Sequence, residues 1–154
     1  MVGCMSLFTI LRSASLEISD NIIELKSKKK TVNYERDGST SIIIPTEFKN
    51  SALIEKALFK YGLKTAGNKD NLNAMLEKDS IRFQLNQNTF DMILTGNFDD
   101  DETKSLYENI TIEYKRMVQE DTYNKVLERL KSRDMAVENE VITEDDSIVL
   151  TVTL

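Results

Sequence analysis

The sequence predicts an α+β fold: a mostly antiparallel sheet built from β-hairpins, with one short helix and one long helix. Three observations lead to this prediction. Stretches of alternating apolar and polar residues recur in pairs around turn residues, as in hairpins. Two other stretches repeat apolar residues at helical spacing. The length of 154 residues, with only five glycines and one proline to form linkers, favours a single domain over residues 1–154.

The N-terminal third is predicted to be rich in strands. Residues 7–18 are expected to form a strand, and the apolar residues within 22–25 either extend it or begin another. Residues 31–36 and 39–44 are β-branched or aromatic at many positions and flank Asp37-Gly38, a pair typical of a type I′ hairpin turn. We therefore expect a hairpin here.

The short helix is predicted to run through Tyr61 from a cap at Asn50 or Ser51. Gly62 follows at once, where helices commonly end in a left-handed residue. The apolar residues on one face of this helix are Leu53, Ile54, Ala57, Leu58 and Tyr61. Residues 63–78 fit no single period, and a further short helix over residues 71–77 is one interpretation of them.

Two more hairpins are predicted from strict alternation. Residues 81–86 and 90–95 alternate apolar and polar side chains across a short turn. Residues 136–142 and 148–154 form the second pair, with a turn near 145–147. In the last strand, Ile148, Leu150, Val152 and Leu154 share one face. This hairpin is expected to bury that face.

The long helix is predicted over about residues 102–133. Asp99 and Glu102 have the spacing of a capping box, and acidic residues suit the positive end of a helix. Its apolar stripe is interrupted at residues 119–122, so the helix is expected to bend or to leave the core there.

Most catalytic and metal chemistry is excluded by composition. The chain has no His and one Cys, Cys4, so it has no Ser-His or Cys-His pair and lacks the usual zinc ligands. No glycine-rich phosphate loop precedes a helix. The acidic run 99–102 could attract a divalent cation, but its spacing fits no EF-hand, and helix capping explains it better. We expect no catalytic residue, no cofactor and no metal.

The net charge and the cysteine content limit which partners and which compartment we expect. Twenty basic and 26 acidic residues give a net charge of −6, which argues against binding to duplex nucleic acid. Residues 78–154 hold 9 basic and 17 acidic side chains, a net charge of −8, and could face a basic partner. The apolar run 1–11 is too short to span a membrane. The single Cys suits a reducing compartment, either the cytoplasm or an organelle stroma.

One short basic run is a candidate partner-binding site. It consists of Lys26, Lys28, Lys29 and Lys30. These side chains could contact phosphate or an acidic protein, and the alternative is a solvated loop or an edge strand guarded by lysine.

Several segments together resemble a known family. The segments are MSLFTI at residues 5–10, SALIEKALFKYG at 51–62, TFDMIL at 89–94 and MAVENEVITEDDSIVLTV at 135–152, with Gln119, Tyr123 and Asn124 in the preceding helix. This pattern resembles the plastid and cyanobacterial family called hypothetical chloroplast reading frame thirty-five, whose function is unsettled. Leu7 stands where that family has His, and residues 19–50 would be an inserted hairpin. The resemblance makes Gln119, Tyr123 and Asn124 candidate partner-binding residues and implies a partnership with an AAA+ ATPase.

These observations favour a non-catalytic protein-interaction module, an accessory or adaptor subunit that binds another protein or self-associates. The first alternative is a small-molecule or nucleotide-binding protein, or an unusual enzyme that relies on carboxylates. The second is an acidic inhibitor or nucleic-acid mimic, which the charge of residues 78–154 would suit.

Overall fold

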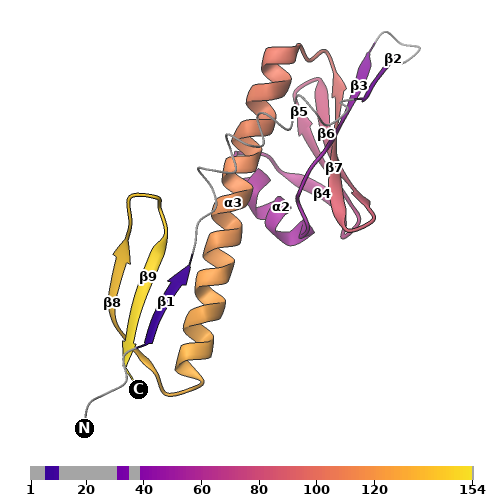
Figure 1. Cartoon of the computed structure of the whole chain (residues 1–154). Coiled ribbons are helices and arrows are strands. Elements are labelled where there is room, and N and C mark those ends of the chain that lie inside the picture. The colour runs from indigo at the N-terminus through magenta and orange to yellow at the C-terminus, as the bar shows by residue number, and fades with distance from the viewer. Residues whose placement is uncertain (1–5, 11–30, 35–38, 154) are drawn as a thin grey trace. The chain divides into compact units, whose positions relative to one another are not determined.

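Two antiparallel sheets and two helices make up the described part of the chain, which confirms the α+β prediction (Figure 1). The computed structural model describes residues 6–10, 31–34 and 39–153. The elements in chain order are β1 (Ser6–Ile10), β2 (Thr31–Tyr34), β3 (Thr40–Pro45), α2 (Ser51–Lys60), β4 (Thr65–Asn68), β5 (Asn71–Leu76), β6 (Asp79–Asn86), β7 (Thr89–Gly96), α3 (Asp100–Lys131), β8 (Ala136–Ile142) and β9 (Ile148–Thr153).

The larger sheet has the order β2-β3-β7-β6-β5-β4, and the smaller has the order β1-β9-β8. The strand pairs β2–β3, β6–β7 and β8–β9 confirm the three predicted hairpins. The predicted strand over residues 7–18 is present as β1 up to Ile10, and its remainder, with residues 22–25, lies outside the described residues. Strand β3 also pairs with β7, so the hairpin within residues 19–50 belongs to the larger sheet. Its being an insertion relative to a family stays a prediction.

The interpretation of residues 71–77 as a helix is wrong, because residues 71–76 form β5 and Glu77 lies in the turn that follows. Leu72 and Ala74 are buried and lie opposite Phe83 and Ile81 of β6. Burial on one face of a sheet, at every second residue, outweighs the weak local helical tendency of this segment. The Asn68 side chain, which accepts from the N–H groups of residues 70 and 71, fixes the tight turn before β5.

The chain divides into two compact units, and the division falls within α3 after Tyr114. We call residues 20–114 the central unit, and residues 1–19 with 115–154 the terminal unit. The larger sheet with α2 belongs to the first, and the smaller sheet belongs to the second. The expectation of one domain over residues 1–154 stays a prediction.

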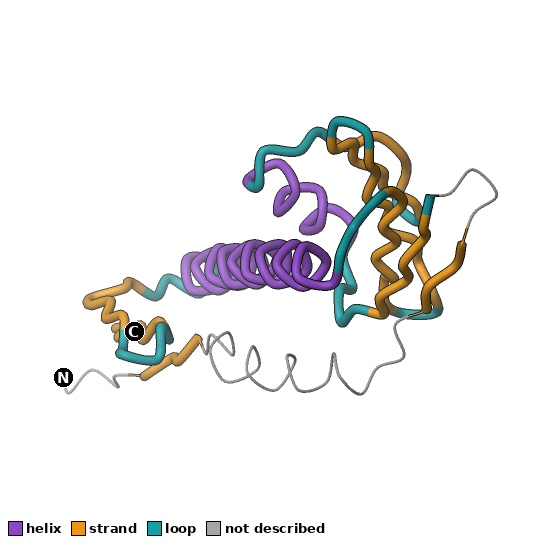
Figure 2. The backbone as a smooth tube through the Cα atoms, turned by 90° about the horizontal axis from the view of Figure 1, so that it is seen from above, coloured by secondary structure: helices purple, strands orange, loops and turns teal. Residues whose placement is uncertain are grey.

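The core of the central unit lies between α2, the first half of α3 and one face of the larger sheet (Figure 2). Of the two predicted caps, Asn50 or Ser51, the structure uses Asn50: its side chain accepts from the N–H groups of Ala52 and Leu53. Gly62 follows the helix with a φ of +95°. The fully buried side chains of this core include Ile44, Ile54, Leu58, Ile81, Phe83, Met92, Leu94 and Ile110.

Helix α3 begins with the predicted capping box. The Asp99 side chain accepts from the Glu102 N–H at 2.7 Å, and the Glu102 side chain accepts from the Asp99 N–H at 3.1 Å. The helix runs unbroken through residues 119–122, but after Met117 its next buried side chain is Leu130. The interrupted stripe therefore marks where the helix leaves a core, as expected.

The core of the terminal unit is small. Leu130 of α3 packs with Leu150 and Val152 of β9, and Ile148 lies against them, which confirms the predicted apolar face of the last strand for these three residues of β9. Leu154, the fourth, lies outside the described residues. Partly buried side chains around this core are Tyr123, Val126, Leu127, Met135 and Ile148. Within the part of the chain that the structure describes, neither helix has a stretch apolar and long enough to cross a bilayer.

Candidate functional site

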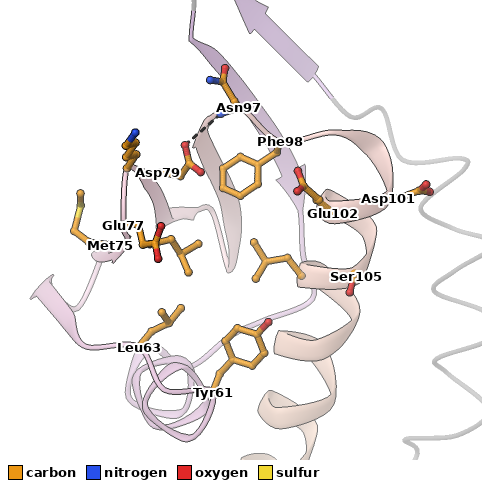
Figure 3. A pocket seen from close by; sticks show the side chains of 13 residues that line it. Tyr61, Leu63, Met75, Glu77, Asp79, Asn97, Phe98, Asp101, Glu102 and Ser105 are labelled. Atoms are coloured by element: carbon orange, nitrogen blue, oxygen red, sulfur yellow. Dashed lines mark hydrogen bonds between the residues drawn. The ribbon is translucent and has the colours of Figure 1, made fainter.

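A groove of about 940 Å³ opens on the central unit (Figure 3). Three segments far apart in sequence line it: the end of α2, the β5–β6 turn, and the loop from β7 into the first turns of α3. Its apolar lining consists of Tyr61, Leu63, Met75, Leu76, Phe98 and Leu106. Its charged lining consists of Glu77, Lys78, Asp79, Asp101 and Glu102.

Two large side chains of the apolar lining are exposed to solvent. Met75 is 65% exposed and Tyr61 is 39% exposed, whereas Leu106 is buried. The sharp turn at Gly62 brings the Leu63 N–H back to the Leu58 carbonyl, at 2.8 Å. This turn places Tyr61 and Leu63 on the same side of the groove, opposite the ring of Phe98 (Figure 3).

Two of the four carboxylates are held by backbone N–H groups. Asp79 accepts from the Asn97 N–H at 3.3 Å (Figure 3), and Glu102 accepts from the Asp99 N–H in the capping box. Gly96 makes this approach of Asp79 possible, because a Cβ there would lie 2.0 Å from Asp79 Oδ1. Four carboxylates against one lysine make the rim of the groove acidic.

This arrangement can bind apolar groups and attract cations. Among the described residues, no group of three or more His, Cys, Asp or Glu side chains has the geometry to hold a metal ion. The run 99–102 instead does what its spacing predicts, since its first and last residues form the capping box. What the groove offers a ligand is apolar surface and carboxylate charge.

Two of the predicted partner-binding residues contact the chain's own C-terminal hairpin. Gln119 Nε2 donates to the Asp146 carbonyl at 3.0 Å, and the Tyr123 hydroxyl donates to Glu140 Oε2 at 2.7 Å. Asn124, the next residue of α3, is exposed. Their role in binding a partner stays a prediction. The basic run of Lys26, Lys28, Lys29 and Lys30 lies outside the described residues.

Two titratable groups of this hairpin region have shifted pKa values. The hydrogen bond to Glu140 raises the pKa of the Tyr123 hydroxyl, because ionised Tyr123 would lose its donated proton and face a carboxylate. Hydrogen bonds from the Thr143 hydroxyl and the Ser147 N–H lower the pKa of Asp145 below its ordinary value of 3.8. The charged form of Asp145 thus stabilises the β8–β9 turn.

The Asp145 interaction is expected to make the turn sensitive to acid. Because its pKa is lower in the folded state, its stabilising contribution is present above about pH 3.8 and is lost as the pH falls through the folded-state value. We expect Asp145→Asn to be less stable than the wild type at about pH 6, and this difference to shrink towards about pH 3. Urea denaturation at both pH values measures it.

Thr143→Val provides the matched background for that measurement. It removes the hydroxyl that contributes most to the lowered pKa of Asp145. In the Thr143→Val background, we expect a smaller pH-dependent difference in the free energy of unfolding between the protein with Asp145 and its Asp145→Asn variant. An unchanged difference would show that the Thr143 hydrogen bond is not its source.

Comparison with known proteins places this chain in no group: no family model, no curated protein and no solved structure matches it. The resemblance to the chloroplast reading-frame family therefore stays a prediction.

Sequence patterns did not predict the groove. Its six apolar residues come from a helix end, a strand end, two loops and the second turn of α3, so none of them marks a shared surface until the fold brings the three segments together.

Proposed function

We propose that this protein is a non-catalytic protein-interaction module, an accessory or adaptor subunit, whose groove in the central unit binds a segment of a partner protein. The segment is apolar at its centre and carries Lys or Arg on both sides. The observation that supports this most directly is the combination of six apolar side chains with four carboxylates and one lysine around one groove.

The apolar lining supports contact with an apolar chain segment. Met75 and Tyr61 expose large side chains in the lining of the groove, while Leu106, which also lines it, is buried. Covering apolar surface of this kind is favourable by roughly 25 cal/mol per Å² removed from water. Large, partly exposed apolar side chains at a concave surface are typical of a binding site.

The charges support a basic partner. Glu77 and Asp101 are both exposed, from the β5–β6 turn and from α3, so a cation can approach either of them. Complementary charges at a rim mainly raise the association rate and select the partner. The resemblance-based expectation of an AAA+ ATPase has no support from the comparisons, so the partner is defined here by its chemistry.

Binding of a small molecule is the second candidate function, because 940 Å³ lies within the range of small-ligand sites. Such sites usually aim several polar groups at one point. Here Asp79 and Glu102 already bind backbone N–H groups, which leaves fewer polar groups to orient a small ligand. This favours a segment of a partner protein over a small molecule as the ligand of the groove.

Fluorescence anisotropy with a labelled peptide tests the proposal on the full chain. The probe has a central Leu-Phe-Leu flanked by two lysines on each side, and the matched peptide has glutamate in place of lysine. Glu77→Lys combined with Asp101→Lys is expected to weaken binding of the lysine peptide about tenfold. Glu120→Lys, an exposed residue of α3 outside the groove lining, is expected to change it less than about twofold.

Three results would contradict the proposal. The glutamate peptide could bind as tightly as the lysine peptide, or Glu120→Lys could weaken binding as much as the groove variant does. A metabolite could also raise the melting temperature of the wild type but not of a Met75→Asp variant, with no peptide bound. That last result would establish the second candidate instead.

A further inference from the structure

The outer edge of β8 is an open strand edge of the terminal unit. Among the described residues only β9 pairs with β8, which makes β8 an edge strand of the smaller sheet (Figure 1). All seven residues of β8 are exposed. Val141 and Ile142 are 47% and 66% exposed, respectively.

The hydrogen-bond pattern shows which backbone groups face outward. The Thr143 N–H donates to the Ser147 carbonyl at 2.9 Å, just beyond the last pair of the ladder. Hydrogen-bonded and non-hydrogen-bonded residue pairs alternate along an antiparallel ladder. Counting back from Thr143, the backbone groups of Val141 and Asn139 therefore bond to β9. Those of Ile142 and Glu140 point away from β9. A β-bulge between Val137 and Asn139 limits this regular edge to its C-terminal half.

Side chains on the two faces of the edge differ. Glu140 and Ile142 lie opposite Leu150 and Ile148 of β9, on the face that packs against α3. Val141 lies opposite Val149 on the other face. The Tyr123 hydroxyl holds the Glu140 carboxylate beside the edge. An added strand would thus meet a carboxylate on one face and a valine on the other.

Charge decides between the possible occupants of this edge. Residues 134–154 contain six acidic residues and no Lys or Arg. A second copy of this chain would bring an identical acidic strand, and like charges beside one another oppose pairing. A strand that carries Lys or Arg at alternate positions gains attraction from the same side chains, which select against self-pairing.

From this edge and its charge, we infer that β8 accepts an extended basic segment of another protein as an added strand, hydrogen-bonded at Glu140 and Ile142. The segment alternates Lys or Arg with apolar residues. This site belongs to the terminal unit and is separate from the groove, so the groove proposal and this one can fail independently.

Amide hydrogen exchange of the full chain, resolved by NMR, tests this inference directly. The probe is a ten-residue peptide of alternating Lys and Val, and the matched peptide alternates Glu and Val. The Lys peptide at saturation is expected to slow exchange at the N–H groups of Glu140 and Ile142 by at least about tenfold. Val141, whose N–H already bonds to β9, is expected to change far less, and the Glu peptide to change nothing.

Two variants at one position separate backbone pairing from apolar contact. Ile142→Pro removes an outward N–H without removing a bond to β9, and Ile142→Thr keeps that N–H. We expect the Lys peptide to bind Ile142→Thr nearly as well as the wild type and Ile142→Pro at least about fivefold more weakly.

The inference would be overturned by peptide binding without slower exchange at Glu140 and Ile142, since that is ionic contact alone. Equal binding of the Glu peptide, or no binding of the Lys peptide to the wild type, would overturn it as well. The groove variant Glu77→Lys with Asp101→Lys is expected to leave the protection at β8 unchanged, which separates the two proposals.

Discussion

Replacing Tyr114 by Ala is expected to lower the free energy of unfolding of the central unit by about 3–5 kcal/mol. Tyr114 is buried, and its ring stacks on Phe48 with the ring centroids 4.2 Å apart. Its hydroxyl accepts from the N–H groups of Lys49 and Asn50 at 3.0 and 3.2 Å. The substitution therefore leaves a cavity and removes the hydrogen-bond acceptor of two backbone groups just before α2.

Tyr114→Phe separates these two contributions. It keeps the stacked ring but removes the acceptor, so we expect a smaller loss of about 1–3 kcal/mol. Urea denaturation followed by circular dichroism measures both variants against the wild type. If the Phe variant were as stable as the wild type, the hydroxyl would contribute nothing. Equal losses for Phe and Ala would mean that the ring does not matter.

The structural features that are set by residues close together in sequence could be predicted. The Asn50 cap, the 99–102 capping box and the three hairpins follow from local spacing, and the structure contains all of them. Residues 71–77 could not be assigned correctly, because their strand exists only through pairing with β6 and β4. Tertiary contacts outweigh local propensity in such segments.

The two proposed binding surfaces could not be predicted from sequence patterns for a related reason. The groove unites segments that are separated by up to 45 positions between Tyr61 and Leu106. At β8, alternation predicts the strand but not its place at the edge of a sheet. The carboxylates of both proposed surfaces fall almost entirely within residues 78–154, the acidic half, and whether a basic partner binds them stays a prediction.

Gly96→Ala is expected to destabilise the central unit by about 3 kcal/mol, the second of the two largest effects. Gly96 has a φ of +146°, which an L side chain rarely adopts, and an added Cβ would lie 2.0 Å from Asp79 Oδ1 and 2.8 Å from Asp79 Cβ. Gly62→Ala is the matched control, because Gly62 also has a positive φ but no atom lies within 4 Å of its added Cβ.

Gly62→Ala should therefore cost only the backbone strain, about 1 kcal/mol. A double-mutant cycle with Asp79→Ala then isolates the contact, since that variant removes the two nearest atoms. We expect Gly96→Ala to cost less in the Asp79→Ala background than in the wild type. If its cost were the same in both backgrounds, or equal to that of Gly62→Ala, the close packing of Asp79 on Gly96 would not shape this side of the groove.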